Sequence, residues 1–199
     1  MEKQKIILSL FLIGCLGSYK SQDLETRKHL VSATATISPG FQKGNNDVNI
    51  YLHGLASFYP EPKVSVDGEI YLFVGGQEQQ TKMAENSTLL FGLNFHFAKD
   101  GNVDPFIGIM PGLSLVSVNN YTLAHPRASE RSIVPVVSFD TGFKFHMAKW
   151  CNTFVCVRYL KGTLVEHHYE ALQLDELRFS FGLGFNLYSK NMYKKSPEK

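Results

Sequence analysis

The chain has 199 residues, of which 44% are hydrophobic, 13% aromatic and 19% charged, and its formal net charge is +2. That balance implies no basic face for nucleic acid, so nucleic acid is excluded as an expected partner. The prominence of Phe, Tyr, Val, Thr and Gly is typical of β-structure, and the length suits one domain with a sizeable core.

The first residues in the chain predict an export signal. Glu2, Lys3 and Lys5 precede an apolar run over residues 6–16, and Gly17 and Ser18 follow it. Such a run has the length of a signal-peptide core and is too short to span a bilayer. We therefore expect a signal peptide over residues 1–22, cleaved between Gly17 and Asp23, a barrel domain over 23–188 and a short polar tail over 189–199.

A second interpretation of the leader remains open. Residues 12–15, Leu-Ile-Gly-Cys, resemble a lipobox, in which Cys15 would be acylated and become the new N-terminus. An unmodified N-terminus is the favoured expectation, because a barrel that spans the membrane needs no lipid anchor. The other two cysteines, Cys151 and Cys156, lie too far apart in an extended strand to form a disulfide.

After the leader, almost the whole chain alternates between apolar and polar residues with a period of two, which is the pattern of a half-buried strand. The clearest case lies near the C-terminus, where Leu177, Phe179 and Phe181 alternate with Arg178 and Ser180. Eight segments follow this pattern: residues 31–41, 48–58, 64–74, 88–97, 106–115, 132–146, 153–161 and 177–188. The sequence therefore predicts eight antiparallel strands.

The connections between these segments alternate in length. Those over 60–62, 99–102 and 148–152 are short, whereas those over 77–86, 119–131 and 162–176 are long and polar; the first connection, 43–47, is shorter than the other loops. Successive connections of an antiparallel sheet lie at opposite ends, so a strict alternation of short turns and long loops places all the short turns at one end. Outer-membrane barrels are built in this way, with short periplasmic turns and longer external loops.

The distribution of charge decides between a soluble and a membrane barrel. In the seven most regular segments the apolar column of alternate residues holds no Lys, Arg, Asp or Glu, although a surface in water would carry many. The predicted fold is therefore an all-β, eight-stranded, up-and-down transmembrane β-barrel. Aromatic residues next to the short turns predict a belt at one membrane interface: Phe58, Tyr59, Phe95, Phe97, Phe106, Phe143, Phe145, Trp150, Phe154, Phe185 and Tyr188.

The leader, the eight strands, the segment Asp-Pro-Phe-Ile-Gly at 104–108 and the closing segment 179–188 together resemble the small outer-membrane β-barrel proteins of Gram-negative bacteria, the OmpX, OmpW and OmpA-barrel group. The resemblance covers nearly all of the chain after the leader. It implies residence in the outer membrane, contact with its lipid and insertion by the barrel-assembly machinery. The chain departs from the usual pattern because eleven residues follow Tyr188, so the assembly signal is expected to be internal.

The polar column of the predicted strands carries the candidate site residues. Its charged members form a putative charge network in the barrel lumen: Glu69, Asp140, Lys144, Arg158 and Arg178. Hairpin geometry places Asp140 opposite Arg158, and Arg178 beside Arg158. Charges in a narrow lumen must be paired. A salt-bridged plug is the favoured interpretation, and a gate that opens a narrow path is the alternative.

No motif points to an enzyme. The sequence lacks a phosphate-binding glycine loop, a G-x-S-x-G motif and a Cys/His nucleophile pair. Glu166, His167, His168 and Glu170 could bind a divalent metal, but adjacent histidines point apart in an extended chain, so neither a metal nor a cofactor is expected.

Three hypotheses of function follow. The first is a structural or surface-interaction barrel, whose external loops bind surface ligands. The second is a narrow, OmpW-like channel for small or hydrophobic solutes. The third is a soluble or lipid-anchored lipocalin-like binder.

Overall fold

The computed structural model describes residues 27–43, 48–76, 83–98, 102–120, 127–128, 130–148, 150–164 and 172–187. Its strands are β1 (Val31–Gln42), β2 (Val48–Glu61), β3 (Val64–Gly76), β4 (Met83–His96), β5 (Val103–Asn120), β6 (Arg127–Ala128), β7 (Ser132–Ala148), β8 (Cys151–Leu164), β9 (Leu172–Gln173) and β10 (Glu176–Leu187). Among these residues, no helix has the length and apolar character needed to cross a membrane.

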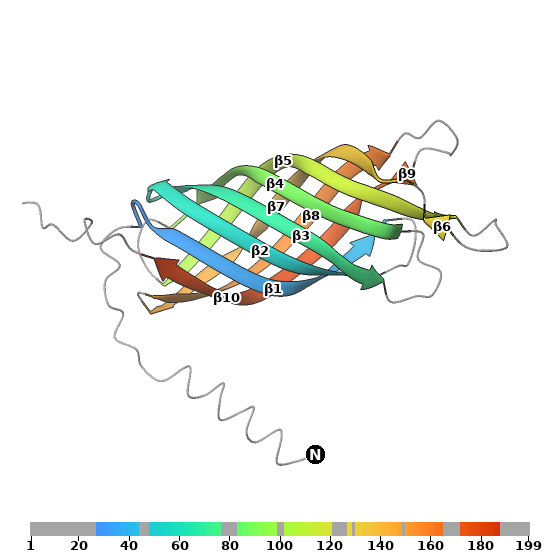
Figure 1. Cartoon of the computed structure of the whole chain (residues 1–199). Coiled ribbons are helices and arrows are strands. Elements are labelled where there is room, and N and C mark those ends of the chain that lie inside the picture. Colours follow the sequence, from blue (N-terminus) through green and yellow to red (C-terminus); the bar gives the residue numbers. More distant parts are fainter. Residues whose placement is uncertain are drawn as a thin grey trace, which may run out of the picture.

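Eight of these strands form a closed antiparallel barrel (Figure 1). Each wall strand pairs with the next one along the chain, and β10 pairs with both β8 and β1, which closes the cylinder. The two-residue strands β6 and β9 extend the wall by pairing with β5 and β8. The predicted fold, an eight-stranded up-and-down barrel, is confirmed.

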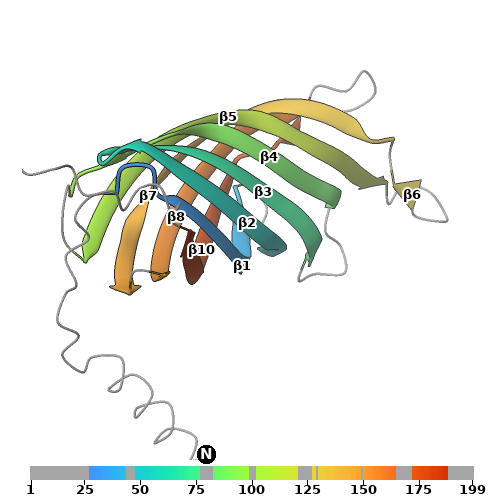
Figure 2. The same cartoon turned by 60° about the vertical axis from the view of Figure 1, so that its left-hand side comes forward.

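The two ends of the barrel differ. The end that holds the connections β2–β3, β4–β5 and β7–β8, with the start of β1 and the last residue of β10, is called the turn end. The opposite end, where β6 and β9 lie, is called the loop end (Figures 1 and 2).

Burial follows the predicted alternation. In β10 the side chains of Arg178 and Ser180 are buried in the interior, whereas Phe179, Phe181 and Leu183 are exposed on the outside. The alternation thus assigns the polar column to the lumen and the apolar column to the outer surface.

Several strands reach further towards the loop end than the sequence predicted. β4 begins at Met83, β5 runs to Asn120 and β8 runs to Leu164, although residues 83–86, 119–120 and 162–164 were expected in loops. The reason is apolar packing: Met83 and Leu164 turn inward and join a buried cluster at the loop end. Similarly Glu176, expected at the end of a loop, is the first residue of β10.

The junction of β1 and β10, where the barrel closes, is held partly by side chains. The ladder pairs Ala35 with Leu183 and Gly40 with Arg178, but the described strands form no ladder pair between these positions. Pro39 lies in this interval and has no N–H to donate. Instead the Ser38 hydroxyl donates to the Phe179 carbonyl oxygen over 2.7 Å, and the Thr36 hydroxyl donates to the Phe181 carbonyl oxygen. Two hydroxyls therefore complete the closure of the barrel.

Candidate functional site in the barrel interior

The outer surface of the barrel is a continuous apolar band. Phe91, Ile133 and Phe181 on three different strands are each more than 60% exposed, and every wall strand contributes exposed large apolar residues. Among the described residues, charged ion pairs at the outer surface lie at the ends: Lys28 with Glu61, and Arg131 with Glu85. A soluble monomer does not expose an apolar surface of this extent, so the band has the character of a surface that faces lipid.

The aromatic belt at the turn end is smaller than predicted. Phe58, Phe95, Phe97, Phe143, Phe145, Trp150 and Phe185 are exposed there, and Tyr188 lies outside the described residues. The prediction was wrong for Tyr59, Phe106 and Phe154, which are buried in the lumen. Glycines opposite two of them provide the room: a Cβ on Gly142 would lie 2.9 Å from the Phe106 ring, and one on Gly182 would lie 3.1 Å from the Phe154 ring.

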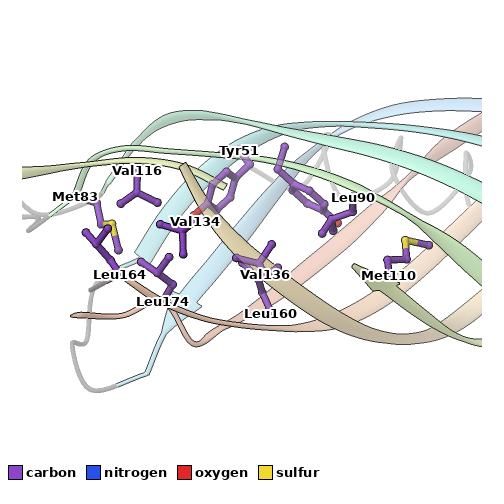
Figure 3. Packing of buried hydrophobic residues seen from close by; sticks show 11 residues of the cluster. Tyr51, Met83, Leu90, Met110, Val116, Val134, Val136, Leu160, Leu164 and Leu174 are labelled. Carbon is purple, nitrogen blue, oxygen red and sulfur yellow. The ribbon is translucent and has the colours of Figure 1, made fainter. Parts of the chain in front are cut away.

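The interior at the loop end contains a large apolar cluster. Figure 3 shows a cluster of buried side chains that point toward one another across the lumen. Its members are Tyr51, Tyr71, Met83, Leu90, Met110, Val116, Val134, Val136, Leu160, Leu164 and Leu174. Because each is at most 6% exposed, the cluster packs like the core of a soluble protein. We name this cluster the apolar cap; buried polar side chains lie beside it, since Glu176 and Asn86 both bond to the hydroxyl of its member Tyr51.

The centre of the lumen holds an ion pair between opposite walls. The Arg158 guanidinium on β8 binds both carboxylate oxygens of Glu69 on β3, with Nη2 2.7 Å from Oε1 and Nη1 bonded to Oε2. Arg158 Nη2 also lies 3.3 Å from Asp140 Oδ2 on the neighbouring strand β7. His53 completes this group, with its Nε2 3.2 Å from Glu69 Oε2. A two-pronged arginine–carboxylate bond is among the strongest ion-pair geometries.

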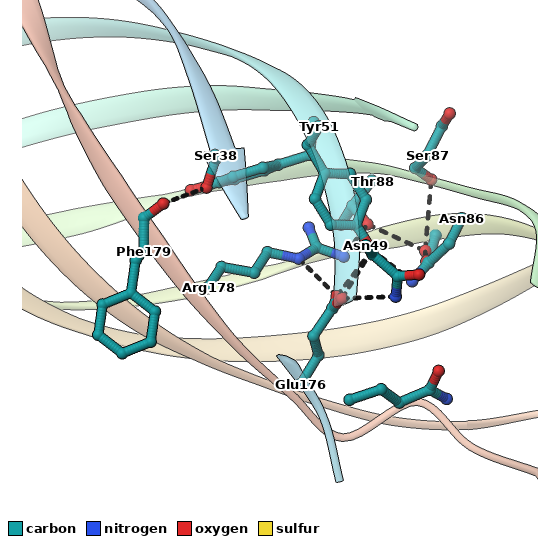
Figure 4. Close-up of polar contacts among 12 residues, drawn as sticks. Ser38, Asn49, Tyr51, Asn86, Ser87, Thr88, Glu176, Arg178 and Phe179 are labelled. Atoms are coloured by element: carbon teal, nitrogen blue, oxygen red, sulfur yellow. Dashed lines mark hydrogen bonds and ion pairs between the residues drawn. The ribbon is translucent and has the colours of Figure 1, made fainter. Parts of the chain in front are cut away.

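A second ion pair lies nearer the apolar cap (Figure 4). Arg178 Nε lies 2.7 Å from Glu176 Oε2, and the same carboxylate accepts hydrogen bonds from the Tyr51 hydroxyl and the Asn49 amide, at 2.8–2.9 Å. The Arg178 guanidinium lies over the Tyr51 ring at 4.1 Å. The Tyr71 ring contacts the guanidiniums of both Arg158 and Arg178, at 5.6 and 4.7 Å from its centroid. Cation–π contacts thus separate two like charges.

Two further basic side chains, Lys144 and Arg27, lie in the lumen toward the turn end. Lys144 donates to the hydroxyls of Ser57 and Tyr59, at 3.2 and 2.9 Å. Closer to the turn end, Arg27 Nη1 lies 2.8 Å from Asp104 Oδ1 and also donates to the Ala98 carbonyl oxygen. Since Arg27 is 1% exposed, its side chain is buried in the lumen near the turn end.

One hydrogen-bonded chain at the turn end resembles the machinery of acyl transfer. Ser65 Oγ lies 2.9 Å from His96 Nε2, and His96 Nδ1 lies 2.7 Å from Asp104 Oδ2. This is the connectivity of a serine nucleophile, its base and an orienting acid. All three side chains are completely buried, and Asp104 is also paired with Arg27. The three side chains are closed to solvent and join β3, β4 and β5 at the turn end.

The structure places all five predicted lumen residues inside the barrel, but it distributes them over three groups. Arg158 lies between Glu69 and Asp140, Arg178 pairs with Glu176, and Lys144 binds two hydroxyls. Sequence reasoning missed four charged residues of the interior: Arg27, Asp67, Asp104 and Glu176. Asp67 lies in the same alternating column as Glu69, so the periodicity contained the signal for that residue.

The structure tests for a metal site only among the described residues, and it does not describe the segment that contains Cys15. Within the described ranges, no three His, Cys, Asp or Glu side chains form a metal-binding group. The segment Glu166–Glu170, residues 1–22 with Cys15 and the tail 189–199 lie outside the described residues. Cys151 and Cys156 are free, buried thiols.

Comparison with known proteins shows the fold of the chain but assigns it to no family. No family model and no curated protein matches the chain. Among solved structures it is similar to the outer membrane protein OprG from Pseudomonas aeruginosa (TM-score 0.57, 11% identity, covering 81% of this chain and 97% of that one). The N-terminal β-barrel domain of Pseudomonas aeruginosa OprF matches with a TM-score of 0.55 and 13% identity, covering 80% and 98% of the two chains.

A third match is Ail, the attachment invasion locus protein of Yersinia pestis, with a TM-score of 0.51, 10% identity and coverage of 80% and 99%. The chain has the fold of the small outer-membrane β-barrels. Each of these small barrels is matched over almost its whole length, so the similarity concerns the complete barrel and not one hairpin.

Proposed function

We propose that the chain is an integral outer-membrane β-barrel protein with a structural or surface-interaction role and no enzymatic activity. The apolar outer band supports residence in a membrane, because only lipid covers such a surface without cost. The fold shared with OprG, OprF and Ail supports the outer membrane as that membrane. The export signal expected over residues 1–22 agrees with this location.

The observation that supports the proposed role is the burial of the side chains in the lumen. The apolar cap, the Glu69–Arg158 bond and the Arg27–Asp104 pair are each built from side chains buried to more than nine-tenths. The interior of an eight-stranded barrel is narrow enough for side chains alone to fill it. On this proposal the lumen gives solutes no path, and the outer surface and the external loops are the parts that act.

The partners expected on this proposal are lipid, the barrel-assembly machinery during insertion, and surface ligands that the external loops contact. The soluble or lipid-anchored binder is disfavoured by the outer band, since a lipocalin-like barrel keeps its apolar column inside and its charges outside.

A gated narrow channel is the second candidate, and one observation favours it. Arg158 lies between carboxylates of two different strands, Glu69 on β3 and Asp140 on β7. A guanidinium between two carboxylates can exchange its hydrogen bonds from Glu69 to Asp140, and such an exchange would rearrange the middle of the lumen.

Conductance of the purified full-length protein in a planar lipid bilayer separates the two candidates. For a filled lumen we expect no stepwise current above that of the protein-free bilayer, in the wild type and in Glu61→Gln, which changes an exposed carboxylate outside the lumen. Discrete steps in the wild type whose open time changes in Glu69→Gln would refute the filled lumen and establish the gate.

A further inference from the structure

The described interior of the barrel contains more acids than bases. Its basic side chains are Arg27, Lys144, Arg158 and Arg178, and its acidic ones are Asp67, Glu69, Asp104, Asp140 and Glu176, all at most 5% exposed. Asp175 is not part of this count, because it binds the hydroxyl of Tyr159, which lies in the outward column of β8. With neutral histidines, one negative charge is left over. A buried charge without a counter-charge is costly, so something must compensate it.

The ion pairs locate this surplus charge. Arg27, Arg158 and Arg178 pair with Asp104, Glu69 and Glu176. Lys144 is then the one remaining base among the described interior residues, and Asp67 and Asp140 are the two remaining acids. Asp140 Oδ2 lies 3.3 Å from Arg158 Nη2, but that guanidinium is already bonded to both oxygens of Glu69.

The two remaining acids and the neighbouring Asn94 carry oxygen atoms that accept no hydrogen bond. Both carboxylate oxygens of Asp140, Oδ1 of Asp67 and Oδ1 of Asn94 are buried and accept no hydrogen bond. Asn94 links the two acids, because its Nδ2 donates to Asp67 Oδ2 over 2.7 Å. Asn94 is 2% exposed and Asp67 fully buried, so bulk water does not solvate these oxygens.

The missing side chain of Gly108 leaves room for two of these oxygens, Asn94 Oδ1 and Asp140 Oδ1. In the β4–β5–β7 register, Gly108 stands between Asn94 and Asp140. A Cβ on Gly108 would collide with both Asn94 Oδ1 and Asp140 Oδ1. Two acceptor oxygens from opposite neighbours therefore converge over a bare Cα, and no described residue donates a hydrogen bond to either of them.

From this geometry we infer a binding site for a small monovalent cation of the sodium class, formed by Asp67, Asn94 and Asp140 over Gly108. Carboxylate and amide oxygens are the ligands that hard cations prefer. One positive charge balances the surplus, whereas a divalent ion would leave the interior with an excess of positive charge beside Arg158 and Lys144. The ligand atoms of this site include no sulfur and no imidazole nitrogen, whereas transition-metal sites usually contain them.

Unfolding of the full chain, folded into phosphatidylcholine vesicles, tests this site. Stability is compared in NaCl and in N-methylglucamine chloride of equal ionic strength, at neutral and mildly alkaline pH. A ligand that binds only the folded state lowers the unfolding equilibrium constant by a factor of one plus its concentration over Kd, which is about tenfold when sodium exceeds Kd about tenfold. We expect the denaturant concentration at the midpoint of unfolding to be higher in sodium for the wild type. The same is expected for Glu61→Gln, which replaces an exposed carboxylate outside the lumen.

Asp140→Asn removes the surplus charge and should make the two salts equivalent, as should Asp67→Asn. Equal stability of the wild type in the two salts would overturn the site and assign the compensation to a proton. A sodium effect that persists in Asp140→Asn would overturn it as well. Should neither variant fold, calorimetric titration of sodium into the folded wild type decides: saturable binding of one ion supports the site, and its absence refutes it.

Discussion

Phe181→Arg is expected to destabilise the folded barrel by about 2–4 kcal/mol in lipid, because Phe181 lies at the middle of β10 and its side chain is 67% exposed on the apolar band. An arginine there places its charge near the centre of the hydrocarbon. The measurement is equilibrium unfolding by urea or guanidinium from vesicles of defined composition.

Leu187→Arg is the matched control, since Leu187 is exposed to a similar extent on the same strand but is its last residue at the turn end. Near the interface the cost of arginine falls to about 0–1 kcal/mol. If both arginines cost the same, or if Phe181→Arg is neutral, the band does not face hydrocarbon. The depth dependence is what separates a lipid-facing surface from an apolar surface in water.

Glu69→Ala is expected to cost about 3–5 kcal/mol, because it leaves the Arg158 guanidinium buried with only the more distant Asp140 as an acid. The same unfolding assay measures the loss. Glu61→Ala breaks the exposed Lys28–Glu61 pair and should cost at most about 1 kcal/mol, as is usual for a solvated ion pair.

The double replacement Glu69→Met with Arg158→Met tests the reason for the loss. Removing both charges avoids the unpaired guanidinium, so the double variant should recover most of the stability lost in Glu69→Ala. If it is less stable than Glu69→Ala, the bond itself and not the unpaired charge dominates, and the assignment of the cost is wrong.

The alternation of residue types was sufficient to predict the barrel wall. With a period of two, each residue of β10 from Leu177 to Leu187 falls on the side of the wall that the sequence indicates, because a strand has only two faces. The closure between β1 and β10 also follows, since eight sequential antiparallel strands with lipid on one side leave no tolerated edge.

Pairing inside the lumen could be predicted only between neighbouring strands. Asp140 is the register partner of Arg158, and Arg178 is another, as hairpin geometry suggests. The bond from Arg158 to Glu69 crosses the lumen between β8 and β3, and its existence depends on barrel diameter and strand stagger, which no local pattern contains.

Two further features of the lumen were not predicted from the sequence, and each has a physical reason. Phe106 and Phe154 were assigned to the interface by residue type, whereas their position in the alternation and the glycines opposite them place them inside. Arg27 precedes the first strand, so no periodicity connects it with Asp104 at the opening of β5. The position of Arg27 in the lumen depends on contacts that form only in the closed barrel, and no pattern in its own segment indicates it.

Fractionation of cells that express the full chain tests the central claim, an apolar outer band embedded in the outer membrane, most directly. We expect the protein in the outer-membrane fraction of a density gradient, retained after alkaline extraction, and migrating differently on a gel with and without boiling because the closed barrel resists detergent. Release of the protein by osmotic shock, or its recovery in the aqueous phase of a detergent partition, would contradict the account.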